Sequence, residues 1–363
     1  MTRWLLAGGG TAGHVNPLLA VADELTASGD EVLVLGTAEG LEARLVPQRG
    51  YELLVIPRLP FPRRPDRAAL RFPRAMAGSL RTTRGHLESR RVDAVLGFGG
   101  YAAAPAYLAA RRSRLPYAIH EQNAKPGLAN RLGARFTPAV GVTFAGTPLP
   151  HAQVVGMPLR REIADLDRAA RRAEAVASFG LDPDRRVLLV TGGSLGAERL
   201  NRTAVASAAA VLAAGWQVLH LAGDRTEVAD PRLPGYRMLP YADRMDLVLS
   251  AADLAVSRAG ASTVSELSAL GLPAVYVPYA VGNGEQRFNA AGVVAAGGAL
   301  LVPDADFTPD TFARIVLPLL ADPDRIARMA SAAGGNGLRD GARRMARLAR
   351  SVLSPTRRVG FRA

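Results

Sequence analysis

The chain has 363 residues, of which 48% are apolar and 21% are charged, a composition typical of a globular protein of about two domains and unlike that of a disordered or collagen-like chain. It contains no cysteine, which excludes disulfides, thiol nucleophiles and thiolate metal centres. The net charge is +13, carried almost entirely by arginine because Lys125 is the single lysine, and this surplus favours an anionic partner such as nucleic acid, lipid or a phosphorylated substrate.

Strand-like and helix-like segments alternate along the whole chain. Short apolar runs predict strands at residues 4–7, 31–35, 53–56, 92–96, 117–120 and 139–142, and a second series at 187–191, 218–221, 254–257, 274–277 and 299–302. Between them, residues such as Leu18, Val21 and Leu25 recur at the spacing of one helix face. This alternation predicts parallel sheets with helices on both faces.

The strand–helix series opens twice, at residues 3–7 and at 187–191, each time with an apolar strand that runs into a glycine-rich turn. Such a turn is how a doubly wound domain begins. We therefore expect an α/β protein of two Rossmann-like, doubly wound parallel-sheet domains, at 1–158 and 159–340. A cleft between the domains is the expected ligand site, and the basic helical segment 341–357 is expected to pack back on the first domain.

The first glycine-rich turn, residues 8–14, allows the backbone to approach a ligand closely. Asn16 is a good N-cap and Pro17 suits the first helical position, so the helix is expected to begin just after His14 and to direct its N–H groups at the turn. His14 is a candidate general base, since imidazole titrates near neutral pH. The alternatives are a turn that binds nothing and a histidine that hydrogen-bonds only within it.

Two later strands of the first domain also end in distinctive residues, the glycine-rich turn 97–101 and the polar run His120, Glu121, Gln122 and Asn123. Open α/β sheets bind ligands at the carboxyl ends of their strands. Four polar residues in a row are also costly to bury without partners. We expect both segments to border the site, with a solvated turn as the alternative for the polar run.

In the second domain, residues 257–266 follow an apolar strand and lead into a helix that Ser262 or Thr263 is expected to open. The N–H groups at such a start can hold a diphosphate, and Glu266 can accept hydrogen bonds from ribose hydroxyls. A capping box that serves only stability is the alternative. After the next strand, Glu285, Gln286 and Asn289 offer donors and acceptors suited to sugar hydroxyls.

Five motifs in order resemble the members of glycosyltransferase family 28 that transfer N-acetylglucosamine from UDP-N-acetylglucosamine to lipid I in peptidoglycan synthesis. They are Gly-Gly-Gly-Thr-Ala-Gly-His at 8–14, His-Glu-Gln-Asn-x-x-x-Gly-x-x-Asn-Arg at 120–131, Gly-Gly-Ser-x-Gly-Ala at 192–197, Arg-x-Gly-Ala-x-Thr-x-x-Glu at 258–266 and Glu-Gln-x-x-Asn-Ala at 285–290. The resemblance spans nearly the whole chain. It implies the GT-B fold, in which two Rossmann-like domains face each other across a cleft.

The resemblance also implies a role for each matching residue. In the first domain, the residues around the donor sugar and the catalytic centre are Thr11, Ala12, Gly13, His14 and Asn123. Those that approach the UDP diphosphate are Arg160, Ser194 and the backbone amides of Ala261, Ser262 and Thr263. Those that hold uracil, ribose and the sugar hydroxyls are Tyr241, Ala242 and Met245, then Glu266, then Gln286 with Glu285 and Asn289.

Two positions depart from the family pattern. Met157 stands where the family has asparagine, which weakens a side-chain role there, and Glu285 stands where it has glutamine, which shifts the sugar-reading role toward Gln286. The implied reaction is attack of the 4-hydroxyl of N-acetylmuramic acid on C1 of the donor, with inversion of configuration. His14 or Glu121 would remove the proton; the sequence does not choose between them, and His14 is favoured.

No metal or other cofactor is expected. The Asp-x-Asp pairs at 182–184, 304–306 and 322–324 resemble the metal motif of another glycosyltransferase architecture. Each precedes a predicted strand or helix, where aspartate caps and turns are common.

The segment 59–91 is basic and apolar together. It carries nine arginines (Arg63, Arg64, Arg67, Arg71, Arg74, Arg81, Arg84, Arg90 and Arg91) against Asp66 and Glu88, with Phe61, Leu70, Phe72 and Met76 among them. This pattern favours docking on an anionic bilayer, where a polyprenyl-pyrophosphate acceptor resides; a solvated helix face is the alternative. Nucleic-acid binding is not expected, because no known nucleic-acid-binding motif accompanies the charge.

No apolar run reaches the roughly 18 residues that span a bilayer, and the N-terminus lacks a signal-peptide core. These absences predict a cytoplasmic chain, and the family resemblance implies a peripheral protein on the cytoplasmic side of the cell membrane that acts in cell-wall synthesis, cell shape and division. The competing functions are a related GT-B transferase with a soluble acceptor, a UDP-N-acetylglucosamine epimerase and a non-enzymatic basic binding protein.

Overall fold

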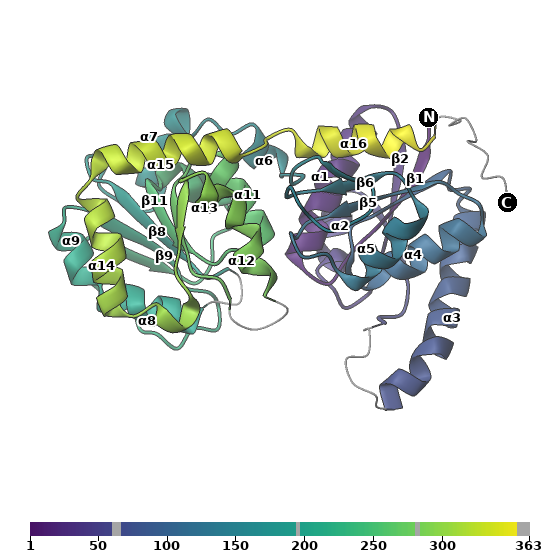
Figure 1. Ribbon diagram of the computed structural model, residues 1–363, viewed down its shortest axis with the longest axis horizontal. Helices are drawn as coiled ribbons and strands as arrows, with labels where there is room; N and C mark the ends of the chain where they lie inside the picture. Colours follow the sequence, from purple (N-terminus) through teal and green to yellow (C-terminus); the bar gives the residue numbers. More distant parts are fainter. Residues whose placement is uncertain (60–66, 194–196, 280–283, 354–363) are drawn as a thin grey trace. The chain divides into compact units, whose positions relative to one another are not determined.

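The computed structural model describes residues 1–59, 67–193, 197–279 and 284–353. The chain divides into two compact units. Unit 1 comprises Met1–Arg160 and Asp340–Ala363, and unit 2 comprises Arg161–Arg339. Figure 1 gives the element labels.

Unit 1 is built on a seven-stranded sheet in the order β3-β2-β1-β4-β5-β6-β7, and every neighbouring pair is parallel. The strands are β1 (Arg3–Ala7), β2 (Glu31–Gly36), β3 (Glu52–Val55), β4 (Ala94–Gly97), β5 (Tyr117–Glu121), β6 (Val140–Val142) and β7 (Ala152–Val154). The helices are α1 (Ala12–Ala27), α2 (Glu42–Gln48), α3 (Arg67–Ser89), α4 (Gly100–Arg112), α5 (Leu128–Gly133), the 3-10 turn η1 (Ala134–Phe136) and α16 (Gly341–Ser351).

Strand β1 contributes side chains to both cores of unit 1, because successive side chains of a strand point to opposite faces of the sheet. Leu5 joins the core beneath α3 and α4, whereas Trp4 and Leu6 join the core beneath α1 and α16. Helix α16 packs along α1 (Figure 1). Its Met345 is fully buried. The C-terminal helix therefore completes the first unit, although more than 170 residues separate it from the rest of that unit.

Unit 2 repeats the architecture with a six-stranded parallel sheet in the order β10-β9-β8-β11-β12-β13. The strands are β8 (Val187–Thr191), β9 (Gln217–Leu221), β10 (Tyr236–Leu239), β11 (Leu254–Ser257), β12 (Ala274–Tyr276) and β13 (Ala299–Leu301). The helices are α6 (Arg161–Ala164), α7 (Arg168–Ser178), α8 (Glu198–Ala206), α9 (Ala208–Ala213), α10 (Met245–Ala251), α11 (Ala261–Ala269), α12 (Glu285–Asn289), α13 (Ala291–Ala295), the 3-10 turn η2 (Asp304–Asp306), α14 (Pro309–Leu320) and α15 (Pro323–Asn336).

The predicted class, two Rossmann-like parallel-sheet domains, is confirmed. Each predicted strand is present with its boundaries shifted by at most a few residues, and the structure adds two edge strands that the sequence did not indicate, β7 and β10. The whole of β7 is exposed, so it lacks the apolar pattern that reveals a strand.

Candidate active site

The first glycine-rich turn leads from β1 into α1, and the helix begins earlier than expected. Thr11 is the N-cap, with extended backbone, and α1 starts at Ala12. The expectation that the helix begins after His14 is therefore wrong, and Asn16 and Pro17 lie inside it. The carbonyl of Thr11 already accepts hydrogen bonds from the N–H groups of His14 and Val15 at 3.0 and 3.1 Å. His14 thus stands in the first turn of the helix.

His14 is held between two glycine-rich turns. Its Nδ1 lies 3.0 Å from the hydroxyl of Thr11, and a Cβ added to Gly99 would lie 3.1 Å from its Nε2. Burial lowers the pKa of His14 to about 4, against the opposing effect of the Glu42 carboxylate. The imidazole is therefore neutral near pH 7 and retains a lone pair that can accept a proton. Thr11 and Ala12 are exposed beside it, and Gly13 is half-buried.

Glu121, the other candidate base, is buried at the end of β5, with 2% of its surface exposed. One carboxylate oxygen accepts from the N–H of Asn123 at 2.9 Å. The other accepts from the N–H of Gly127 at 3.0 Å and from the side-chain amide of Asn130 at 2.9 Å. Burial raises the pKa of Glu121, although these hydrogen bonds oppose the shift. The carboxylate organises the 121–127 turn, and this use of its oxygens favours His14 as the base.

His120, the first residue of the polar run, makes structural contacts. His120 is fully buried, and its Nε2 lies 3.0 Å from the carbonyl of Gly156. Burial lowers the pKa of His120 to about 4. Met157, which stands where the family has asparagine, has a buried side chain. Arg160 is half-buried and is the last residue of unit 1 before the chain enters unit 2. Asn123 is half-buried at the turn.

In unit 2, one cavity of about 110 Å³ brings together residues from distant parts of the sequence. Five predicted site residues line it: Tyr241, Ala242, Met245, Thr263 and Glu266. The remaining lining comes from the ends of β8 and β9 and from neighbouring helices: Leu189, Thr191, Gly193, Leu221, Pro240, Leu249 and Leu267. The apolar residues of this lining were not predicted as site residues, because in the sequence they resemble ordinary core residues of strands and helices.

Helix α11 begins beside this cavity, again earlier than expected. Gly260 is the N-cap and Ala261 the first helical residue, so neither Ser262 nor Thr263 opens the helix. Both lie half-buried in its first turn, while Ala261 is buried. Because the N-cap is a glycine, no side chain caps the first turn of α11.

The residues predicted to read the sugar brace the same turn. The side-chain oxygen of Gln286 accepts from the N–H groups of Ala259 and Tyr279 at 3.2 and 2.8 Å. The side chain of Asn289 is buried and donates to the carbonyl of Ala259 at 3.3 Å. Glu285 is half-buried at the start of α12. Ser194 lies outside the described residues.

The aspartate pairs serve turns, caps and ion pairs. Asp182 accepts from the N–H of Asp184 at 2.9 Å, and Asp322 caps α15 by accepting from the N–H of Arg325 at 2.8 Å. Asp304 pairs with Arg258 and Arg199 at 2.5 and 3.3 Å. Within the described ranges, no three histidine, aspartate or glutamate side chains gather as a metal site would require.

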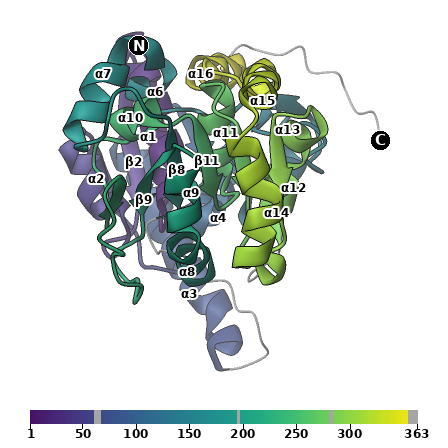
Figure 2. The same ribbon diagram turned by 90° about the vertical axis from the view of Figure 1, so that its left-hand side faces the viewer.

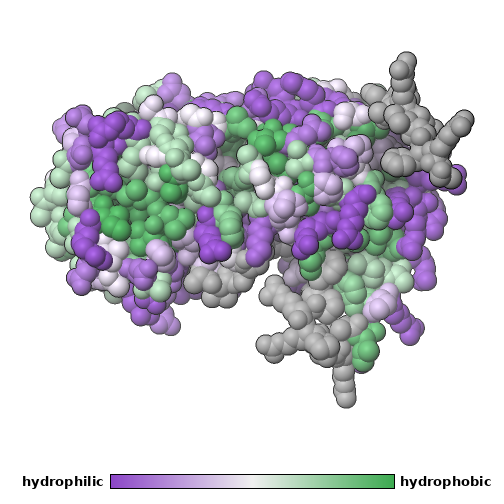
Figure 3. Space-filling model, viewed as in Figure 1, coloured by the Kyte–Doolittle hydropathy of each residue, from purple (hydrophilic) through white to green (hydrophobic). Residues whose placement is uncertain are grey.

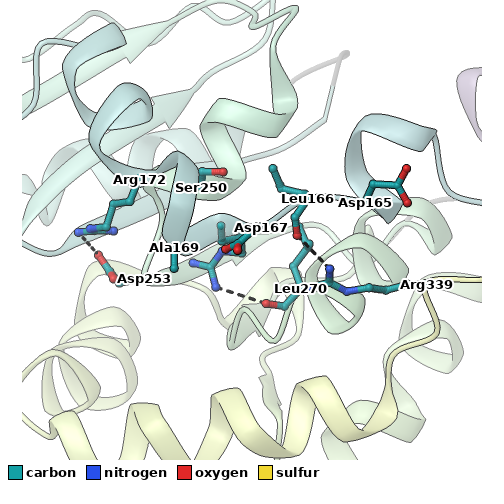
Figure 4. A pocket seen from close by; sticks show the side chains of 10 residues that line it. Asp165, Leu166, Asp167, Ala169, Arg172, Ser250, Asp253, Leu270 and Arg339 are labelled. Atoms are coloured by element: carbon teal, nitrogen blue, oxygen red, sulfur yellow. Dashed lines mark hydrogen bonds and ion pairs between the residues drawn. The ribbon is translucent and has the colours of Figure 1, made fainter.

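A larger cavity of unit 2, about 490 Å³, is lined by none of the predicted site residues (Figure 4). Its arginines are occupied by the protein itself. Arg168 donates to the carbonyls of Leu249 and Leu270, Arg339 to the carbonyl of Leu166, and Arg172 pairs with Asp253 at 3.0 Å. These contacts hold helix ends together, so size alone does not make this cavity the reactive site.

Helix α3 carries the described part of the basic segment. Its C-terminal half packs on α4 through buried Leu80 and Leu87, and its N-terminal half extends from unit 1 (Figure 1, Figure 2). There Leu70 is 83% exposed, and Figure 3 shows hydrophobic and hydrophilic residues side by side on the helix. Phe61, Arg63 and Arg64 lie outside the described residues. In the described ranges, no helix is both long and apolar enough to span a bilayer.

Two Rossmann-like parallel-sheet units and a cavity at the strand ends of the second define the class of the protein, the α/β proteins of GT-B type. Profiles described as the glycosyltransferase family 28 N-terminal domain and C-terminal domain match residues 4–142 and 187–345. The chain therefore belongs to glycosyltransferase family 28.

Relatives cover almost the full length of the chain. A protein of Leifsonia xyli subsp. xyli is 63% identical over 98% of this chain and 99% of its own. A protein of Mycolicibacterium smegmatis is 51% identical over 98% of this chain and 95% of its own. Both are named UDP-N-acetylglucosamine–N-acetylmuramyl-(pentapeptide) pyrophosphoryl-undecaprenol N-acetylglucosamine transferase.

Solved structures agree on the fold. Acinetobacter baumannii MurG is 28% identical, with a TM-score of 0.80 over 97% of this chain and 100% of its own. The calicheamicin glycosyltransferase CalG4 is 19% identical, with a TM-score of 0.68 over 98% of this chain and 99% of its own, and supports the fold alone. The same holds for the Neisseria meningitidis UDP-GlcNAc 2-epimerase, which is 15% identical with a TM-score of 0.65 over 94% of this chain and 98% of its own.

Proposed function

We propose that this chain transfers N-acetylglucosamine from UDP-N-acetylglucosamine to the 4-hydroxyl of N-acetylmuramic acid in undecaprenyl-pyrophosphoryl-MurNAc-pentapeptide, the lipid I to lipid II step of peptidoglycan synthesis. The observation that carries the proposal is the cavity of unit 2, which gathers five residues assigned in advance to the uridine nucleotide. The names of relatives such as the Leifsonia xyli protein support the choice of substrates.

The donor nucleotide binds in unit 2. Uracil lies against Tyr241, Ala242 and Met245, and the ribose hydroxyls donate to the Glu266 carboxylate, which lines the same cavity. The diphosphate meets the N–H groups at the start of α11, where the helix dipole favours negative charge. Gln286 offers its amide NH₂ to the sugar, while Asn289 positions the turn rather than the sugar.

The acceptor hydroxyl is activated from unit 1. We assign the base to Nε2 of His14, with Nδ1–H donated to the hydroxyl of Thr11, because that contact fixes the ring and leaves Nε2 to take the proton. As the hydroxyl attacks C1, the bond from C1 to the UDP oxygen breaks and the configuration inverts. Charge grows on the leaving diphosphate, and the α11 amides and the Arg160 guanidinium stabilise it.

The membrane supplies the acceptor. The exposed arginines of α3 attract an anionic surface, and the exposed Leu70 inserts its apolar side chain into that surface. We place the protein peripherally on the cytoplasmic side of the membrane, where it reaches a polyprenyl-linked acceptor. A related transferase with a soluble acceptor is the second candidate, favoured only by the shared fold, and α3 gives it no support.

The test is radiolabelled transfer from UDP-N-acetylglucosamine to a lipid I analogue, with a soluble monosaccharide acceptor and UDP-glucose as the comparison substrates. We expect product only with UDP-N-acetylglucosamine and the lipid-linked acceptor. Equal transfer to the soluble acceptor would replace the proposal with the second candidate, and no transfer at all would refute it.

A further inference from the structure

A buried carboxylate lies beneath the first glycine-rich turn, and the reaction proposed above does not use it directly. Glu42, the first residue of α2, is 1% exposed. One of its oxygens accepts from the N–H of Gly10 at 2.8 Å. The other accepts from the N–H and the hydroxyl of Thr37 at 3.0 and 2.7 Å. The side chain therefore ties the turn after β1 to the turn after β2.

The space around this carboxylate exists because three neighbouring positions lack a side chain. A Cβ on Gly9 or on Gly40 would overlap the Glu42 carboxylate, and a Cβ on Gly36 would lie 2.6 Å from Glu42 Cγ. Gly9, Gly36 and Gly40 thus leave the space that this one acid occupies. The glycines of the first turn serve the protein's own side chain as well as any ligand.

The charge state of this carboxylate is set by its partners. Burial opposes ionisation, but the hydrogen bonds from Gly10 and Thr37 outweigh it and hold the pKa of Glu42 below its ordinary value. An ionised acceptor forms stronger hydrogen bonds than a neutral one. The grip on the Gly10 N–H is accordingly a charge-assisted one.

The contact lies next to the reacting group. Gly10 is followed by Thr11, whose hydroxyl contacts Nδ1 of His14 and whose backbone begins α1. We propose that Glu42 is a positioning residue for the transfer reaction: by fixing the backbone at Gly10 it fixes Thr11, and through Thr11 the direction of the His14 ring. This inference rests on the proposed function.

The substitution that isolates this role is Glu42→Gln. The substitution keeps the size of the side chain but replaces one acceptor oxygen with an NH₂ group. That group cannot accept a hydrogen bond from Gly10 or Thr37, so the contact with the turn is weakened. Thr37→Val is the milder companion, because it removes only the hydroxyl donor and leaves the Gly10 contact. Glu39→Gln is the matched control, since Glu39 lies in the same loop with its side chain exposed.

For Glu42→Gln we expect kcat for transfer to fall about 10- to 100-fold, as for a misplaced catalytic group. KM for UDP-N-acetylglucosamine and the Kd for UDP are expected to stay within about twofold of the wild type, since the nucleotide binds in unit 2. Thr37→Val is expected to follow more weakly and Glu39→Gln to match the wild type. Unchanged kcat in Glu42→Gln, or an equal loss in Kd for UDP, would overturn the inference.

A second readout does not depend on turnover. The ring-proton NMR signals of His14 are expected to move in Glu42→Gln and to stay in place in Glu39→Gln. Unmoved signals would overturn the positioning role even if the wild type proved inactive toward lipid I, an outcome that would refute the proposed function alone. If Glu42→Gln fails to fold, Thr37→Val decides: a lowered kcat with moved His14 signals supports the inference, and wild-type values for both overturn it.

Discussion

Units 1 and 2 open with the same construction, a buried strand, a glycine-rich turn and a helix, yet the two turns surround different things. In unit 1 the space behind the turn is filled by the chain's own carboxylate, Glu42. In unit 2 the strand ends border a cavity of about 110 Å³, lined by Thr191, Tyr241 and Glu266 among others. Under the proposed function, the same supersecondary element supports the base His14 in unit 1 and borders the nucleotide site in unit 2.

Removal of the reactive imidazole should have the largest effect. His14→Ala is expected to lower kcat for transfer about 10²- to 10⁴-fold, the range for loss of a general base, while the Kd for UDP stays unchanged. His151→Ala, a control at an exposed histidine of unit 1, should retain activity. Measured by radiolabelled transfer, a loss of less than about tenfold would remove His14 from the role of base and return that role to Glu121.

The membrane contact should depend on unit 1 alone. Changing the exposed Arg71, Arg74 and Arg81 to Gln should weaken partitioning onto phosphatidylglycerol vesicles about a hundredfold, since each arginine near an anionic surface contributes about 1 kcal/mol. The matched control is the same change at exposed arginines of unit 2, Arg232, Arg325 and Arg328. Equal binding by both variants in a co-sedimentation assay would contradict docking through α3.

Nucleotide affinity should depend on unit 2. Glu266→Ala is expected to weaken UDP binding by about 2 kcal/mol, or roughly thirtyfold, because a hydrogen bond to a charged group is lost. Glu227→Ala, at an exposed glutamate of the same unit, should bind UDP as the wild type does. Isothermal titration calorimetry measures both, and an unchanged Kd in Glu266→Ala would take this residue out of the site.

Acid should destabilise both units. Burial lowers the pKa of His120 in β5 and of His220 in β9 to about 4. Each stays neutral in the fold while its unfolded counterpart takes up a proton, so stability is lost as pH falls from 6.5 toward 4. Each should cost about 1 kcal/mol between pH 7 and pH 5.5.

The check is the melting temperature at both pH values for the wild type and for His220→Gln. The wild type should melt lower at pH 5.5, and the variant should lose part of that dependence. A melting temperature that rises on acidification would contradict the predicted sign.

The fold was predictable because buried parallel strands appear in the sequence as short apolar runs. The two missed strands, β7 and β10, are at sheet edges and are partly or wholly exposed. Helix starts were less predictable. The good capping residues Asn16 and Ser262 lie inside helices whose N-caps are Thr11 and Gly260, where the backbone is extended and no side chain caps the helix.

The nucleotide side of the site was predictable from local motifs, since Tyr241 and Glu266 stand within recognisable segments. Glu42 was not, because it reads as an ordinary acid near a helix start. Its burial depends on the missing side chains of Gly9 and Gly36. These two glycines come close together because β1 pairs with β2. The sequence signal that could have indicated Glu42 is the cluster of glycines at the ends of two neighbouring strands, because such a cluster leaves space for a side chain from another segment.

A crystal structure with UDP bound is the most direct measurement of where the nucleotide binds. We expect the uracil against Tyr241 and Met245, the ribose on Glu266 and the diphosphate at the start of α11. UDP bound instead at the 8–14 turn of unit 1, with the unit 2 cavity empty, would contradict the proposal that unit 2 binds the nucleotide and unit 1 supplies the base.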